Sequence, residues 1–121
     1  MNTRIDCCHE VLEAHVLIRQ WLSGEARPAL LARFAEGFSM FTLKGTVLDK
    51  HQLEAFFHQV QGTRPGLRID IDELREVAPG VVTYREWQHD DRGQSTVRWS
   101  TAVFDRQGKW LHLQETAATT C

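Results

Sequence analysis

The sequence predicts an α+β fold, in which a curved antiparallel sheet wraps around three N-terminal helices and leaves a cavity at the wide end of a cone. Apolar and polar residues alternate in the second half of the chain, as in Leu67, Ile69 and Ile71. A period of two is typical of strands. The first half instead repeats apolar residues at spacings of three and four, which is typical of helices. Helices gathered before strands favour an α+β arrangement over repeated βαβ units.

Three helices are predicted in the first half of the chain. The first covers residues 4–22, where one apolar stripe includes His15 and Ser23-Gly24 ends the helix. Pro28 predicts the start of a shorter second helix, which Gly37 ends, and residues 38–43 follow as a strand. Asp49 predicts the start of the third helix, because Gln52 stands three residues later as its capping-box partner.

Four strands joined by tight turns are predicted between Leu67 and Thr116. The turns carry residues suited to them, at Pro79-Gly80, at residues 90–93 and at residues 105–108. One face of such a sheet is too apolar for water, so we expect the helices to cover it.

Bulk properties exclude several classes of function. A chain of 121 residues predicts a single domain, residues 1–121. The net charge is −2 and the two signs are interspersed, which argues against nucleic acid or an anionic membrane as partner. No apolar run has the length of a membrane span, and the N-terminus lacks the apolar core of a signal peptide. We therefore expect a cytoplasmic protein.

The cysteines and glycines predict neither a disulfide framework nor a cofactor. The three cysteines are Cys7, Cys8 and Cys121, an odd number with two adjacent, which fits a reducing compartment. Cys7-Cys8-His9 lacks the spacing of a zinc site, and the chain has no glycine-rich phosphate loop. We expect no metal, nucleotide or other cofactor.

Short segments over nearly the whole chain resemble the nuclear transport factor 2-like superfamily, in particular its SnoaL-like and ketosteroid-isomerase-like members. The segments are Trp21–Gly24, Leu31–Met40, Gly45, Val47–Asp49, Arg98–Thr101, Gly108–Trp110 and Gln114–Thr116. The resemblance implies the cone-shaped roll of that superfamily, also called cystatin-like. It does not imply one activity, because the fold hosts isomerases, dehydratases, cyclases and association domains.

The resemblance also argues against steroid-isomerase chemistry. Those isomerases use a tyrosine, an aspartate base and a protonated aspartate, which correspond here to about Leu17, Thr42 and Ser100. Leucine and threonine cannot exchange a proton at neutral pH, and serine is a weak donor. No catalytic residue is assigned.

His15, Thr42, Arg98, Ser100 and Gln114 are the candidate pocket residues. His15 lies on the apolar stripe of the first helix, where a histidine serves either as an acid–base group or as a hydrogen-bonded core residue. The arginine and the glutamine suit a carboxylate or carbonyl of a ligand. His51 and His58 are expected at the surface.

The sequence leaves open which face of the sheet lines the cavity. One predicted face mixes polar groups with aromatics: Arg85, Trp87, Arg98, Ser100, His112, Gln114 and Thr116. The other is more apolar: Val82, Tyr84, Glu86, Val97, Trp99, Thr101, Leu111, Leu113 and Glu115. If the second face is the inner one, Glu86 and Glu115 lie in a desolvated cavity, where a carboxyl group gains a raised pKa.

Two hypotheses of function remain open. In the first, the protein binds a small, mostly apolar molecule, with an isomerase-, dehydratase- or cyclase-like activity if it has one. In the second, it is a non-catalytic association or scaffold module. Either way we expect a homodimer, because three of the four tryptophans lie in the sheet and aromatic residues are enriched at interfaces.

Overall fold

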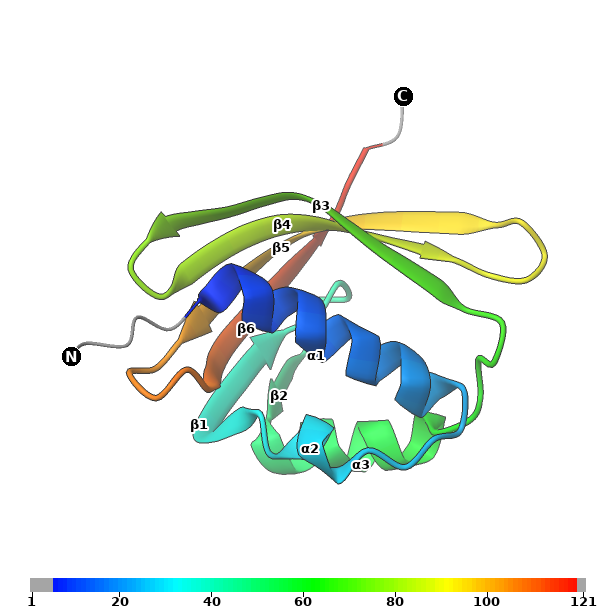
Figure 1. The fold of residues 1–121 in the computed structure, drawn as a ribbon, viewed down its shortest axis with the longest axis horizontal. Helices are drawn as coiled ribbons and strands as arrows, with labels where there is room; N and C mark the ends of the chain where they lie inside the picture. Colours follow the sequence, from blue (N-terminus) through cyan, green and yellow to red (C-terminus); the bar gives the residue numbers. More distant parts are fainter. Residues whose placement is uncertain (1–5, 120–121) are drawn as a thin grey trace.

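The computed structural model describes residues 6–119. Within them, six strands form one strongly curved sheet, and three helices lie on its concave side (Figure 1). The strands lie in the order β2-β1-β6-β5-β4-β3. The elements are α1 (Cys7–Leu22), α2 (Pro28–Leu31), β1 (Phe34–Phe41), β2 (Val47–Asp49), α3 (Lys50–Val60), β3 (Arg68–Ala78), β4 (Val81–His89), β5 (Ser95–Phe104) and β6 (Trp110–Ala117). No helix among these residues is long and apolar enough to cross a membrane.

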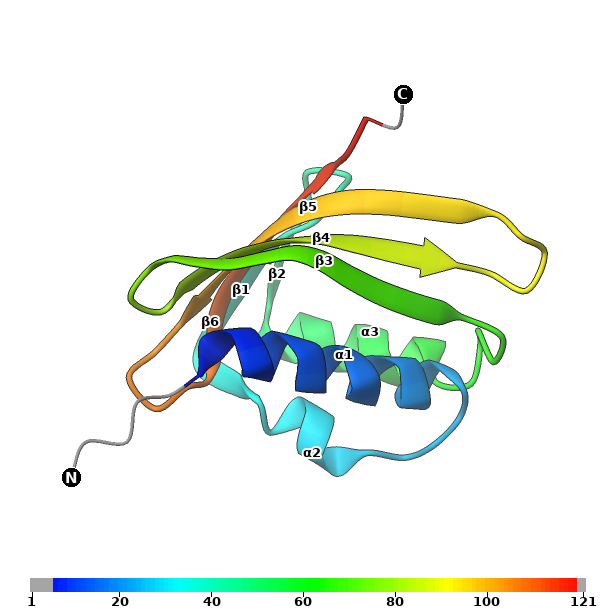
Figure 2. The ribbon, with the colours of Figure 1, turned by 45° about the horizontal axis from the view of Figure 1, so that its top comes forward.

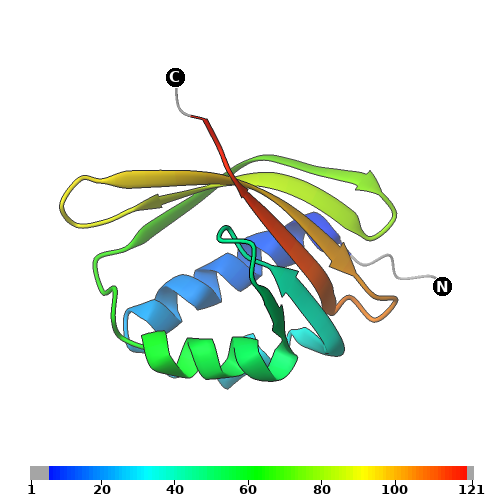
Figure 3. The same ribbon diagram turned by 180° about the vertical axis from the view of Figure 1, so that it is seen from behind.

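The predicted fold class is confirmed, with α1 lying beneath the long strands (Figure 2). The expectation of a wholly antiparallel sheet needs one correction, because β1 and β6 pair in parallel. The sheet is mixed, and it gains the short strand β2 beside β1. Alternation along a strand fixes which residues share a face, but it does not reveal the neighbouring strand. Figure 3 shows β1 and β6 side by side from behind.

The second helix and the first strand differ from prediction. The helix has one turn and ends at Leu31, and the strand starts at Phe34, four residues early. Phe34 pairs with Trp110 in the parallel ladder, and Phe34 and Phe38, four residues apart on one strand, are both buried in the core. Their rings lie 5.0 Å apart in an edge contact. Burial of two aromatic rings in the sheet outweighs one further helical turn.

The ends of the helices follow the local sequence. Asp49 and Gln52 form the predicted capping box, with Asp49 Oδ1 accepting from the Gln52 N–H at 2.8 Å and Gln52 Oε1 accepting from the Asp49 N–H at 2.9 Å. The first helix begins at Cys7, with Asp6 as its N-cap, and the predicted positions 4 and 5 lie outside the described residues.

Aromatic residues pack together where the start of β6 meets β1 and α1. Trp110 is almost fully buried and touches the rings of Phe34 and Phe104, at centroid distances of 6.0 and 4.8 Å. Its indole N–H donates to Glu10 Oε2 of α1 at 3.0 Å. Trp110 therefore joins the last strand to the first helix through both packing and a charge-assisted hydrogen bond.

Replacing Trp110 by phenylalanine is expected to lower the free energy of unfolding by about 2 kcal/mol, because it removes that hydrogen bond and leaves a gap in the core. Urea denaturation measures the effect. Phe56→Leu is the control, since Phe56 is exposed on α3 and its replacement should change stability by under about 0.5 kcal/mol. Equal effects of the two substitutions would contradict this role of Trp110.

Candidate functional site

A cluster of polar side chains lies buried between α1 and the concave face of the sheet. The ladder pairs Glu86 of β4 with Arg98 of β5, and it pairs Ser100 of β5 with both Tyr84 and Glu115. Residues directly opposite in a sheet share a face, so these five side chains project together towards His15 of α1. We call His15, Tyr84, Glu86, Arg98, Ser100 and Glu115 the inner polar cluster.

His15 is held by two hydrogen-bond acceptors. Its Nδ1 lies 2.7 Å from the carbonyl oxygen of Val11, one turn earlier on α1, and its Nε2 lies 3.1 Å from Glu86 Oε1. A carbonyl and a carboxylate can only accept, so both ring nitrogens donate and the ring is an imidazolium. Burial alone would lower the pKa of His15, but the Glu86 carboxylate outweighs burial and raises it above 6.5.

Glu86 is kept ionised although it is buried. Burial favours its neutral form, yet the charge of His15, the hydrogen bond from His15 and a 2.7 Å hydrogen bond from Gln88 Nε2 lower the pKa of Glu86 to about 2. Its neighbour Glu115 behaves differently. Burial, reinforced by the charge of Glu86, raises the pKa of Glu115 although Arg98 Nη1 donates to its two oxygens at 3.3 and 3.4 Å.

Three polar atoms of the cluster have no hydrogen-bond partner among residues 6–119. They are the Tyr84 hydroxyl, the Ser100 hydroxyl and Arg98 Nε. Tyr84 is completely buried and Ser100 is 3% exposed. The two hydroxyls are neighbours across the ladder, close enough for a hydrogen bond from Ser100 to lower the pKa of Tyr84 against the larger effect of burial, although the contact falls outside ordinary hydrogen-bond geometry. Burial, together with the charges of Glu86 and Glu115, raises the pKa of Tyr84 well above its usual value, so the phenol is neutral.

The structure brings together three of the five predicted pocket residues: His15, Arg98 and Ser100. Thr42 lies at the β1–β2 turn, where its hydroxyl is 2.6 Å from that of Thr46. Gln114 is exposed and pairs with Thr101, which is not part of the cluster.

The two predicted faces are corrected by the register of β4 and β5. The prediction placed Arg98 and Ser100 on the face of Arg85, whereas the ladder places them opposite Glu86 and Tyr84. A shift of one residue between neighbouring strands exchanges their faces, and nothing in the alternation of either strand alone detects it. The inner face therefore combines residues from both predicted sets.

Sequence reasoning missed Gln88 as a functional candidate and treated Tyr84 only as an apolar-face residue. The available signal was their spacing, because residues 84, 86 and 88 are every second residue of one strand and therefore share a face.

Across residues 6–119, no group of three or more histidine, cysteine, aspartate or glutamate side chains is arranged to hold a metal ion. The cluster can orient a polar group and exchange protons with it.

Comparison with solved structures identifies the class of protein. No protein-family model matches the chain, and no curated protein matches it significantly. An NTF2-like protein of unknown function from Pseudomonas aeruginosa is 47% identical, with a TM-score of 0.83, over 92% of this chain and 97% of that one. The chain therefore belongs to the NTF2-like proteins, those that share the fold of nuclear transport factor 2.

Two more distant structures share the fold. A computationally designed binder of 17-OHP is 15% identical, with a TM-score of 0.68, over 88% of this chain and 92% of that one. A protein from Agrobacterium tumefaciens, proposed to be an isomerase of the SnoaL-like family, is 9% identical, with a TM-score of 0.73, over 95% of this chain and 100% of that one. Similarity at this level concerns the fold alone.

Replacing His15 by glutamine tests the ion pair. A raised pKa in the folded state means that the charged histidine adds stability below pH 6.5, and that this stability is lost as pH rises through the raised pKa. At pH 6 the variant should be about 3 kcal/mol less stable than the parent, because Glu86 stays buried without its charged partner. The difference in unfolding free energy between the parent and the variant should become smaller as the pH rises, because the parent then loses the charge on His15.

Thermal and urea unfolding between pH 6 and 9 measure this difference. His51→Gln is the matched control, since His51 is exposed on α3 and its replacement should leave the pH profile unchanged. A deficit in His15→Gln that stays constant over the whole pH range would show that His15 contributes by packing alone.

Proposed function

We propose that this protein binds a small, mostly apolar molecule in the cone, with one oxygen of that molecule placed against the inner polar cluster. The observation that supports this most strongly is the set of buried polar atoms without a protein partner, Tyr84 OH, Ser100 Oγ and Arg98 Nε. Each buried polar atom left unsatisfied costs about 1–3 kcal/mol, and native proteins hold few of them. A carbonyl or carboxylate oxygen accepts hydrogen bonds from all three.

Apolar side chains beside the cluster suit the rest of such a molecule. Leu17 and Ile18 follow His15 on α1, and Leu113 precedes Glu115 by two residues on β6 and pairs with Met40 of β1. All four are partly buried against the core. Small-molecule sites typically combine an apolar lining with a few polar groups that fix orientation.

The same groups support proton transfer as the reaction, in keeping with the isomerase-, dehydratase- or cyclase-like class. With a ligand carbonyl oxygen at Tyr84 and Ser100, the negative charge that develops on it is stabilised by both hydroxyls and by Arg98. Glu115, whose pKa is raised, is suited to take a proton from the carbon next to that carbonyl. The C–H electron pair moves into the new C=C bond, and the proton returns at another carbon.

The scaffold alternative differs in what occupies the cone. Phe34, Phe104 and Trp110 are buried and fill part of the interior, as such a module requires. The convergence of six polar side chains in the same interior, with the His15 ring 6.2 Å from that of Trp110, favours a ligand-binding protein. Stability alone does not require these groups, because apolar residues of similar volume are often as stable as a buried ion pair.

Tyr84→Phe tests the ligand site. The probe is 2-hexanone, an uncharged ketone, and the reporter is the methyl group of Met40, the only methionine besides Met1. The parent protein should bind the ketone with a saturating shift of this NMR signal, and Tyr84→Phe should weaken binding about tenfold, because it removes one hydrogen-bond donor. Native mass spectrometry of the purified protein gives a second measurement, a retained small molecule.

Thr42→Ala serves as the matched control for a hydroxyl outside the cluster, and it should leave ketone affinity unchanged. Unchanged affinity in Tyr84→Phe, or the lack of any saturating shift in the parent, would argue for the scaffold alternative.

We further propose that the outer face of the sheet pairs with a second copy of the chain. There Arg85 donates to both oxygens of Asp72, at 2.7 and 2.6 Å, and its guanidinium lies 5.1 and 5.4 Å from the ring centres of Trp87 and Trp99. Trp99 is 44% exposed and Phe41, further along the same face, is 43% exposed. Exposed aromatic residues and arginine are enriched in protein interfaces.

Light scattering after size exclusion tests this proposal. The parent should have twice the 13.9 kDa mass of the chain, and Trp99→Lys should be a monomer. Leu12→Lys, an equally exposed apolar position on α1, is the control and should keep the dimer mass. A monomeric parent protein would contradict the pairing.

A further inference from the structure

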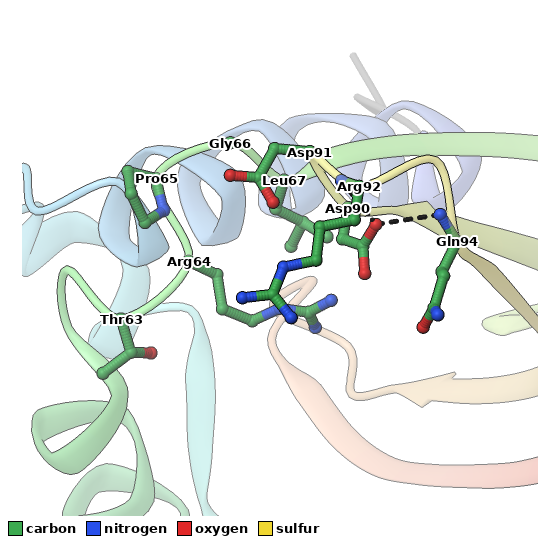
Figure 4. Close-up of a pocket in the computed structure, with 9 residues that line it drawn as sticks. All are labelled: Thr63, Arg64, Pro65, Gly66, Leu67, Asp90, Asp91, Arg92 and Gln94. Carbon is green, nitrogen blue, oxygen red and sulfur yellow. Dashed lines mark hydrogen bonds between the residues drawn. The ribbon is translucent and has the colours of Figure 1, made fainter.

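A hollow of about 350 Å³ lies where the β4–β5 turn meets the loop between α3 and β3. We call it the rim hollow, and Figure 4 shows the residues that line it. They are Thr63, Arg64, Pro65, Gly66, Leu67, Asp90, Asp91, Arg92 and Gln94. Figure 1 shows the same hairpin projecting beyond the end of α1.

Both walls of the rim hollow are fixed by hydrogen bonds. In the loop, the Arg64 N–H donates to the carbonyl oxygen of Leu22 at the end of α1, at 3.0 Å. In the turn, Asp90 Oδ1 accepts from the backbone N–H groups of Arg92 and Gln94, each at 2.9 Å. The walls also touch, because a Cβ atom on Gly66 would lie 2.7 Å from that of Asp91. A site held in place before binding loses less entropy on binding.

Two arginine side chains extend into the rim hollow, one from each wall (Figure 4). The guanidinium of Arg92 has no ion pair or side-chain hydrogen bond within residues 6–119, and that of Arg64 has one hydrogen bond, to an uncharged amide. Asp90 and Asp91 also line the hollow, but neither pairs with an arginine there. Guanidinium groups recognise carboxylates through paired N–H donors, so this arrangement suits one carboxylate.

A chain of hydrogen bonds joins the rim hollow to the inner polar cluster. Arg64 Nη1 donates to Gln88 Oε1 at 2.9 Å, Gln88 Nε2 donates to Glu86 Oε2, and Glu86 Oε1 accepts from His15. Gln88 and Glu86 are two residues apart on one strand, a separation of about 7 Å. Two side chains of one strand, Gln88 and Glu86, therefore connect the arginines of the rim hollow to the cluster.

We infer that the rim hollow binds the carboxylate of an amphipathic carboxylic acid whose apolar part enters the cone. This inference rests on the proposed function and narrows its ligand from any small apolar molecule to an acid. The carboxylate contacts Arg64 and Arg92, and the apolar part lies against Leu17, Ile18 and Met40.

Hexanoate and hexanamide, which differ in charge but hardly in shape, are the probes. NMR titration of the parent protein, followed at Met40, should give hexanoate an affinity about tenfold higher than that of hexanamide. Arg92→Gln and Arg64→Gln should each lower hexanoate affinity towards that of hexanamide, without changing hexanamide affinity. Arg106→Gln, which removes an exposed arginine from the β5–β6 turn, is the charge-matched control and should change neither.

Asp91→Asn should change hexanoate affinity in the opposite direction to the arginine variants. It removes a negative charge from the wall with little change of shape, so hexanoate affinity should rise severalfold while hexanamide affinity stays the same. If Arg92→Gln does not lower hexanoate affinity, or if Asp91→Asn does not raise it, the inference is overturned.

The outcomes also separate this inference from the proposed function. Equal affinity of the parent for both probes would overturn the acid-binding role and leave the apolar site in the cone intact. Arginine-dependent binding of hexanoate without any binding of hexanamide would support the rim hollow and contradict the apolar site. Binding of neither probe would overturn both.

Discussion

The contact between His15 and Glu86 is the constraint on which the interior of this protein depends. It joins the first helix to the middle of the fourth strand, 71 residues further along the chain, within the inner polar cluster. Two charges removed from water are tolerated only when they pair well and their remaining polar atoms are satisfied. The Val11 carbonyl and the Gln88 amide complete that requirement, so the helix can lie on the sheet in only one register.

The interior under the curved sheet has an aromatic part and a polar part, and His15 lies between them. On one side of His15, Trp110 and its aromatic neighbours pack into the core. Further along, four charged groups come together with two neutral hydroxyls: His15 and Arg98 are positive, Glu86 is negative, and Glu115 is the carboxyl group that burial pushes towards neutrality. An ionised pair beside a carboxyl of raised pKa is a combination that favours proton exchange.

The sequence was sufficient for the fold class, the capping box at Asp49 and the three turns of the sheet, because these depend on local chemistry and periodicity. It was insufficient for the parallel pairing of β1 with β6 and for the start of β1 at Phe34, both of which depend on a distant partner, Trp110. The site was accessible only in part. His15 stood out on an apolar stripe, whereas the meeting of Glu86 with Arg98 depends on a one-residue register that each strand's own pattern leaves free.

The protonation of the His15 ring tests the account most directly. Long-range ¹H–¹⁵N NMR distinguishes a ring with two N–H groups from a ring with one. At pH 6.5, where an unperturbed histidine is half protonated, we expect His15 to be mainly doubly protonated, with Nδ1 donating to Val11 and Nε2 donating to Glu86. A neutral ring with one bare nitrogen at that pH would contradict the buried ion pair and the arrangement of the cluster built on it.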